Sequence, residues 1–184
     1  MMRRDEIMDT IVEPINSLQM QQVRACTEDY LQRATDLYAT GFAPVAVHFD
    51  LSGRAAGMYV VRAGVRRIRY NPYIFAKYFA SSLRTTVPHE VAHYVTDQLY
   101  GLHNIRPHGK EWQQVMRAFG VTPRATGNYD LSGVPVRRQR RFSYRCACRE
   151  HQLSCVRHNK IQRRQVRYLC QSCGSVIRFD GEPG

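Results

Sequence analysis

Along the first half of the chain, stretches with helical spacing of apolar residues alternate with stretches of strand composition. In residues 15–40 the apolar positions recur mostly at three- and four-residue intervals, which predicts an amphipathic helix. Residues 45–51, 57–63 and 65–71 are short, rich in β-branched and aromatic side chains, and separated by turn residues. They predict a small antiparallel sheet, with Gly64 in the tight turn between its second and third strands.

Helices are predicted again after the sheet. Asn71-Pro72 ends the sheet and begins a short helix over about residues 73–80. A longer helix is expected from about 83 to 100, and a further one over about 109–119. This order of elements indicates an α+β fold.

The last part of the chain differs from the rest in composition. Residues 122–143 are rich in Thr, Gly, Pro and Arg, which predicts a linker, and five of the six cysteines follow it. Only Cys26, expected to be a small buried side chain, precedes it. Residues 1–136 hold 15 Lys and Arg against 12 Asp and Glu, whereas residues 137–184 hold 12 against 3. We therefore expect a main domain over 1–136 and a small basic module over 137–184.

Nothing in the sequence predicts secretion or a membrane span. No apolar run approaches the roughly 18 residues that a span requires. The first residues carry charges without the apolar segment of a secretory signal. We therefore expect a cytoplasmic protein, and in a reducing compartment clustered cysteines favour metal binding over disulfides.

The stretch VPHEVAHYVTDQLYGLHNIRPHGKEW, residues 87–112, concentrates side chains that bind metals. His89 and His93 lie one helical turn apart, so both can reach one ion. Glu90 lies about 100° round the helix, close enough to take a proton from a metal-bound water without being a ligand. Such a site needs a third protein ligand and an open fourth position. Three other histidines are candidates: His103, His108 and His48.

The alternative is a helix that merely carries polar residues on its exposed side. Val87, Val91, Val95 and Leu99 form a stripe that would bury one face of the helix and hold the histidines in place. Pro88 is expected in the opening turns of this helix, where proline is tolerated. The sequence therefore favours a catalytic metal site.

Several motifs together resemble one known family. VPHEVAHYV, PHGKEW, the segment GRAAG at 53–57 and IRYNP at 68–72 are similar to the SprT family, bacterial relatives of the SPRTN (Spartan) DNA-dependent metalloproteases. The resemblance covers residues 45–179. It implies a zincin-like metalloprotease core followed by a zinc-ribbon-like module, and a substrate that is protein bound or crosslinked to DNA.

The same resemblance implies roles for single residues. His89 and His93 would be the first two zinc ligands, Glu90 the general base and His108 the third ligand. The local sequence also favours His108 over His103, since His108 stands at the start of a helix. Trp112, on the first turns of that helix, is expected to pack in the core. None of Tyr70, Tyr94 and Tyr100 is singled out as the oxyanion stabiliser.

The cysteine-rich tail predicts a second metal site. Cys170 and Cys173 form a CxxC knuckle followed by glycine. Cys146, Cys148 and His151 compete for the two remaining places. The resemblance extends to this segment, whose cysteines would hold a structural zinc through Cys146, Cys148, Cys170 and Cys173, with His151 as the alternative ligand. The competing interpretation is a set of reduced cysteines without metal.

Arginines surround these cysteines and suggest contact with nucleic acid. The candidates are Arg137, Arg138, Arg140, Arg141, Arg157, Arg163 and Arg164. Such contacts would be salt-sensitive and weakly selective for sequence. Phe142, Tyr144 and Tyr168 either stack on bases or form the core of the module, and His158 is a further candidate for either metal or nucleic acid. The competing interpretation is a solvated basic surface.

The expected function is a zinc-dependent metallopeptidase with one catalytic and one structural zinc, acting on proteins bound or crosslinked to DNA. Manganese or iron could also occupy a site of three histidines. The alternative is a non-catalytic nucleic-acid-binding adaptor. A magnesium nuclease is disfavoured, because no acidic cluster is present. No obligate protein partner and no membrane partner are predicted.

Overall fold

The computed structural model describes residues 11–136 and 140–181. The chain divides into two compact units, residues 1–136 (unit 1) and residues 137–184 (unit 2). Within the described residues, no helix combines the length and the apolar character needed to cross a membrane.

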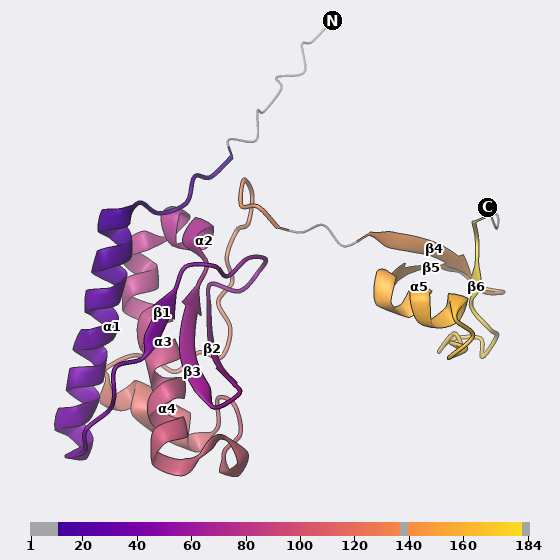
Figure 1. The fold of residues 1–184 in the computed structure, drawn as a ribbon. Helices are drawn as coiled ribbons and strands as arrows, with labels where there is room; N and C mark the ends of the chain where they lie inside the picture. Colours follow the sequence, from indigo (N-terminus) through magenta and orange to yellow (C-terminus); the bar gives the residue numbers. More distant parts are fainter. Residues whose placement is uncertain (1–10, 137–139, 182–184) are drawn as a thin grey trace, which may run out of the picture. The chain divides into compact units, whose positions relative to one another are not determined.

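Unit 1 contains a mixed three-stranded sheet (Figure 1). Its strands are β1 (Ala46–His48), β2 (Gly57–Arg62) and β3 (Val65–Tyr70), in the order β1-β3-β2. β2 and β3 form an antiparallel hairpin, and both Ala63 (φ 49°) and Gly64 (φ 76°) are left-handed, as a two-residue turn requires. The predicted turn is confirmed. The fully antiparallel sheet is wrong, because β1 pairs with β3 in parallel. A loop and not a tight turn connects β1 to β2, so β1 is free to pair with β3 instead of β2. β3 is therefore the central strand.

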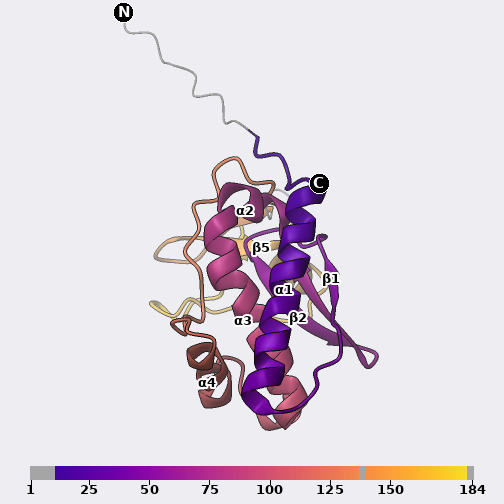
Figure 2. The ribbon, with the colours of Figure 1, turned by 90° about the vertical axis from the view of Figure 1, so that its left-hand side faces the viewer.

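In the described residues of unit 1, four helices and one short turn accompany this sheet. They are α1 (Ser17–Tyr38), α2 (Pro72–Lys77), α3 (Phe79–Tyr100), the 3-10 turn η1 (Leu102–Asn104) and α4 (Lys110–Ala118). α1 begins with a capping box between Asn16 and Gln19. α1 and α3 lie side by side, and α3 also contacts β2 and α4 (Figure 2). α3 is therefore in contact with most of unit 1.

α3 starts earlier than the sequence predicts. It begins at Phe79, so Pro88 lies more than two turns inside the helix and not in its opening turns. Proline lacks the N–H that would reach the carbonyl four residues back, which weakens a helix locally. The burial of Val87, Val91 and Val95, all with 0% exposure, holds the helix together across this position. Residues 89–93, the HExxH motif formed by His89, Glu90 and His93, thus lie in the middle of a long, packed helix.

The core of unit 1 joins α1, the sheet, α3 and α4. Its buried side chains include Val23, Ile68, Val91 and Trp112. Cys26 is half-buried against this core, and burial raises the pKa of its thiol to about 11. It is therefore a protonated packing residue at neutral pH.

The segment after α4 is part of unit 1. Val134 is buried against Ala56 and Ile74, and the ammonium group of Lys77 lies 2.7 Å from an Asp130 carboxylate oxygen. The predicted linker is therefore wrong for residues 122–136. Its apolar residues are few and widely spaced, so their burial depends on partners far away in the chain. Residues 137–139 of the predicted linker lie outside the described residues.

Unit 2 is a small antiparallel sheet with one helix. Its elements are β4 (Arg141–Arg145), β5 (Glu150–Ser154), α5 (Cys155–Gln162) and β6 (Arg178–Phe179), with strand order β5-β4-β6. Tyr144, Leu153, Cys170 and Ile177 form its buried core. This core is small, which leaves room for a metal to contribute to stability.

Candidate functional site

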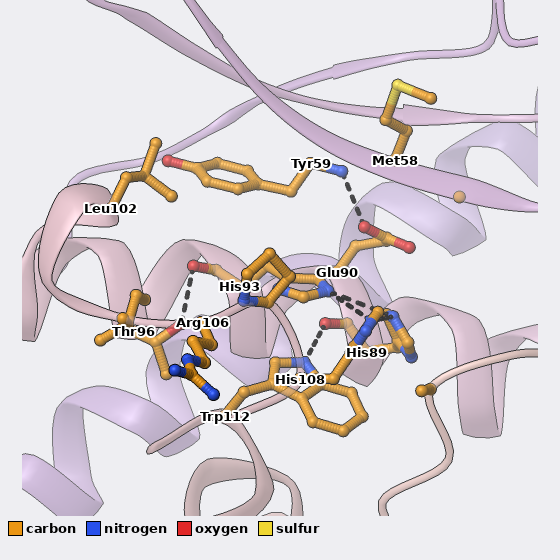
Figure 3. A pocket seen from close by; sticks show the side chains of 14 residues that line it. Met58, Tyr59, His89, Glu90, His93, Thr96, Leu102, Arg106, His108 and Trp112 are labelled. Carbon is orange, nitrogen blue, oxygen red and sulfur yellow. Dashed lines mark hydrogen bonds between the residues drawn. The ribbon is translucent and has the colours of Figure 1, made fainter. Parts of the chain in front are cut away.

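Three histidine side chains of unit 1 meet at one point (Figure 3). The Nε2 atom of His93 lies 3.2 Å from that of His89 and 3.1 Å from that of His108, and the His89–His108 distance is 3.0 Å. A neutral imidazole carries an N–H on one ring nitrogen and a lone pair on the other. Three Nε2 atoms this close together are best explained by three lone pairs that point toward one place. A zinc ion about 2.0–2.1 Å from each nitrogen would hold tetrahedral ligands roughly 3.3 Å apart. The three residues therefore fit the ligand set of one ion.

Two local features bring the third histidine to the other two. His89 and His93 are on successive turns of α3, whereas His108 lies in the loop before α4. His108 has a φ of 58°, which is rare for a residue other than glycine and is typical of functional sites. A Cβ on Gly109 would come within 2.9 Å of the Arg106 carbonyl oxygen, so glycine is required beside it. The PHG sequence is thus a tight turn that places the imidazole over α3.

Trp112 forms a wall behind the three histidines. Its ring centroid lies 4.7 Å from that of His89, 5.5 Å from that of His93 and 4.7 Å from that of His108. Its indole N–H donates to the carbonyl oxygen of His89 over 3.2 Å. Its predicted place in the core is confirmed, at 2% exposure. Its contact with the histidines was not predicted, although its place in the first turn of the helix that follows His108 was a signal for it.

The surroundings keep these histidines neutral. Burial, together with the neighbouring imidazoles, lowers the pKa of His89 to about 4 and that of His93 to about 3. Burial also lowers the pKa of His108. Neutral imidazole is the form that binds metals, so protons compete little for this site at neutral pH.

Glu90 is held beside the histidines by the edge of the sheet. One of its carboxylate oxygens accepts a hydrogen bond of 2.7 Å from the backbone N–H of Tyr59 on β2. A Cβ on Gly57 would lie 2.6 Å from the other oxygen, so only glycine allows this close approach. Burial raises the pKa of Glu90 to about 8, and the Tyr59 N–H acts in the opposite direction. A cation bound by the histidines would favour the ionised carboxylate, which is the form that accepts a proton.

Asp97 fastens the surrounding segments to α3. One of its carboxylate oxygens accepts hydrogen bonds from the Tyr59 hydroxyl at 2.5 Å and from Arg66 Nε at 2.6 Å, and the other accepts from the Leu102 N–H at 3.1 Å. Burial raises its pKa, but the bonds from Tyr59 and Arg66 outweigh this effect and the pKa is lowered. The sheet edge and the start of the loop that carries His108 are thereby fixed to one helix. A role for Asp97 was not predicted; its spacing of four residues from His93 was the available signal.

Two clefts meet at His89 and Glu90. One has a volume of about 370 Å³ and includes Met58, Leu102 and Arg106 in its lining (Figure 3). The other has a volume of about 510 Å³ and extends along the N-terminal half of α3. His89 and Glu90 line both clefts. The site therefore opens on two sides of the Glu90 carboxylate.

The remaining candidates in unit 1 lie elsewhere. His103 is exposed on η1 and His48 is exposed on β1. Tyr70 and Tyr94 are buried, with hydroxyl groups bonded to Thr27 and to the Ala43 carbonyl. Tyr100 is exposed, and in the described part of the chain none of these three tyrosines lines either cleft.

Four cysteines of unit 2 form a second cluster, with their sulfur atoms within 4.8 Å of one another. Cys146 Sγ lies 3.5 Å from Cys148 Sγ, which lies 3.7 Å from Cys170 Sγ, and Cys173 completes the group. Tetrahedral zinc–thiolate bonds of about 2.3 Å would place the sulfurs roughly 3.8 Å apart. His151 Nε2 is 3.1 Å from Cys146 Sγ, at hydrogen-bonding distance. The four thiols fit one zinc ion, with His151 as a neighbour of a ligand.

The aromatic residues of unit 2 pack with one another. The rings of Phe142 and His158 stack with centroids 3.6 Å apart, and the Tyr144 hydroxyl lies 3.0 Å from His158 Nδ1. Tyr144 has 0% exposure and Tyr168 is half-buried. These side chains therefore form the core of the module, and Tyr144 is not accessible for stacking on a base.

The candidate nucleic-acid contacts are at the surface wherever they are described. Five of the arginines are exposed: Arg140, Arg141, Arg157, Arg163 and Arg164. Arg137 and Arg138 lie outside the described residues. The guanidinium of Arg140 lies over the Phe142 ring, and that of Arg157 over the Tyr168 ring. Exposed cationic groups backed by aromatic rings are available to phosphates.

Comparison with known proteins identifies the family. The SprT-like family profile matches residues 27–140. Protein SprT of Vibrio parahaemolyticus is 36% identical over 154 residues, which cover 83% of this chain and 89% of that protein. Protein SprT of Actinobacillus succinogenes is 37% identical over 144 residues, which cover 78% and 81%. Protein SprT of Pseudomonas paraeruginosa is 36% identical over 166 residues, which cover 88% and 96%.

No solved structure matches this chain. The family profile and the relatives nevertheless agree with each other, and they confirm the resemblance to the SprT family. The chain belongs to the SprT-like family.

Proposed function

We propose that this chain is a zinc-dependent metallopeptidase that hydrolyses peptide bonds in proteins bound or crosslinked to DNA. The observation that carries the proposal is the triangle of Nε2 atoms with sides of 3.0–3.2 Å, with the buried Glu90 beside it. Zinc bound there would supply Lewis-acid chemistry to a water molecule and a peptide carbonyl.

Each part of the chain has a task in this reaction. His89, His93 and His108 bind the ion, and Trp112 supports their rings. The N–H of Tyr59 holds one oxygen of the Glu90 carboxylate, which leaves the other oxygen to accept the proton of the attacking water and to pass it to the leaving amine. In the described part of the chain, β2 pairs with β3 alone, so its outer edge is available to an extended peptide beside the clefts.

Unit 2 would bring the enzyme to its substrate. Its cysteines fit a structural zinc, and its segment of the chain holds 12 Lys and Arg against 3 Asp and Glu. The exposed arginines would bind phosphates with little sequence preference. Six free thiols and the two clusters suit a reducing compartment, which supports a cytoplasmic location.

The decisive experiment compares the zinc-loaded wild type with Glu90→Gln on a DNA-bound protein. The amide keeps the size of the side chain but cannot accept the proton, so we expect cleavage to fall by at least about 100-fold. Zinc content, measured by elemental analysis, should stay the same because Glu90 is not a ligand. Undiminished cleavage by the zinc-loaded variant would refute the mechanism. Absence of cleavage by the wild type would favour the non-catalytic adaptor.

A further inference from the structure

The larger of the two clefts has a distinct chemical character. It has a volume of about 510 Å³, within the range of ligand-binding clefts. Apart from Glu90, the charged residues that line it in the described part of the chain are Arg54 and Arg124. Among residues 11–136 and 140–181, no carboxylate forms an ion pair with either of these arginines. We call it the basic cleft.

The rest of this lining mixes polar residues with apolar ones such as Met116 and Val121. Hydroxyl and amide groups come from Ser81, Thr85, Thr86, Thr122, Thr126, Asn128 and Tyr129. The smaller cleft presents a different surface, with Met58, Leu102, Ile105 and Pro107 around Arg106. The two sides of the histidine centre therefore offer unlike surfaces to the two ends of a peptide.

The wall of the basic cleft is held in place before any ligand arrives. The hydroxyl groups of Thr86 and Tyr129 are 2.9 Å apart, and Tyr129 lies so close to Gly127 that a Cβ there would come within 2.4 Å of its ring. Asp130, which follows Tyr129 in the chain, is held by an ion pair with Lys77. Arg124 and His89 line the same cleft, which places this arginine on the side of the reaction centre where the basic cleft lies. A preformed wall loses little entropy when a ligand binds.

We propose that the basic cleft is a subsite for a carboxylate adjacent to the scissile bond, recognised by Arg54 and Arg124. Because His89 and Glu90 line one end of this cleft, a substrate that occupies it places a residue close to the bond that is cut. The carboxylate belongs either to an Asp or Glu side chain or to a free C-terminus, and guanidinium groups bind both in the same way. This inference rests on the proposed peptidase function and adds a substrate preference to it.

Binding can be measured without catalysis in the zinc-loaded Glu90→Gln variant. The probes are fluorescent peptides of neutral sequence with one Asp, Asn or Lys at the centre and an amidated C-terminus. A second set carries Asn at the centre and a free C-terminal carboxylate. We expect one of the two carboxylate probes to bind roughly fivefold more tightly than the amidated Asn peptide, as for a partly exposed ion pair. The two sets distinguish a side chain from a chain terminus.

The double variant Arg54→Ala, Arg124→Ala, made in the Glu90→Gln background, should abolish this preference. Arg84→Ala is the matched control, since Arg84 is an exposed arginine on α3 that lines neither cleft. Thermal unfolding checks that all variants remain folded. Equal binding of all probes, or no detectable binding of any, would overturn the proposal. So would a preference that survives the double substitution, or a double variant that loses only affinity for DNA.

Cleavage gives an independent readout. The active protein is incubated with a mixed peptide library, and the new termini are identified by mass spectrometry. Asp, Glu or the C-terminus should be enriched at one position beside the cut, and the enrichment should disappear with Arg54 and Arg124. Cleavage without enrichment would refute the subsite and leave the peptidase intact. Carboxylate-selective binding without cleavage would refute the peptidase and leave the subsite.

Discussion

The histidine centre of unit 1 and the cysteine centre of unit 2 differ in the type and number of their potential ligands and in their surroundings. The first offers three neutral ligands and lies between two clefts, with a buried carboxylate at its side. The second offers four thiols, and in the described part of the chain none of them lines either of those clefts. A site with three ligands leaves a coordination position for a substrate, whereas four thiolates close the shell. The number of ligands thus suits the histidine site to binding a substrate and the cysteine site to stabilising the fold.

The two centres also differ in what supports them. The histidines stand on α3, whose valine stripe is fully buried in a core shared with α1, the sheet and α4. The cysteines stand on turns around a core of Tyr144, Leu153, Cys170 and Ile177. Unit 1 should therefore fold without its metal, and unit 2 should depend on its metal.

The largest effect should follow the loss of thiols. With Cys170→Ser and Cys173→Ser, unit 2 should unfold, since structural zinc contributes on the order of 10 kcal/mol to such modules. Unit 1 should remain folded, because its core is independent. Amide NMR spectra would show loss of dispersion for unit 2 only, and elemental analysis would show one zinc ion fewer. Cys155→Ser, at an exposed cysteine outside the cluster, is the control. A folded double variant would show that the two centres are alike in their effect on folding.

A methyl group at Gly57 should disable the histidine centre without removing its metal. Gly57→Ala places a Cβ 2.6 Å from Glu90, so the carboxylate or β2 must move. We expect at least a tenfold loss of cleavage, because small misplacements of a catalytic group have large effects, and about 1–3 kcal/mol less stability. Zinc content should be unchanged. Gly41→Ala, where the new Cβ meets nothing within 4 Å, should leave cleavage and stability unchanged.

The two candidate metal-binding clusters could be predicted in part from the sequence, because parts of each depend on local spacing. Two histidines four residues apart must share a helix face, and a CxxC knuckle brings two sulfurs together by itself. His108 needed the family motif as well, because a left-handed residue in a loop has no periodic signal. Three further features were not predicted: the parallel pairing of β1 with β3, the start of α3 well before Pro88, and the packing of residues 122–136. Each depends on contacts between segments distant in the chain, which local periodicity does not encode.

The hydrogen bonds that Tyr59, Arg66 and Leu102 donate to Asp97 also join segments that are distant in the chain. Removing them would test how rigidly the histidine centre is held. Asp97→Asn keeps the size of the side chain but weakens the bonds to Tyr59 and Arg66, so stability should fall by about 1–3 kcal/mol. The folded-state pKa of Asp97 is lowered, so its contribution is present above its unfolded pKa and is lost as the pH falls through the folded value. Urea unfolding at neutral and acidic pH should therefore show a difference between wild type and variant that shrinks in acid. A difference that stays constant with pH would exclude the ionised carboxylate as its source.

The smallest effect is expected at the wall behind the histidines. Trp112→Phe keeps an aromatic ring against the three imidazoles but removes the hydrogen bond to the His89 carbonyl. Losing one buried hydrogen bond and some ring volume should lower stability by about 1–2 kcal/mol, measured by urea unfolding followed by circular dichroism. Zinc at the cysteines should be unaffected, because Trp112 belongs to the core of unit 1. If zinc is instead lost from the histidines, the ring orients the ligands as well as packing against them, and the histidine centre depends on its aromatic wall as much as on its three nitrogens.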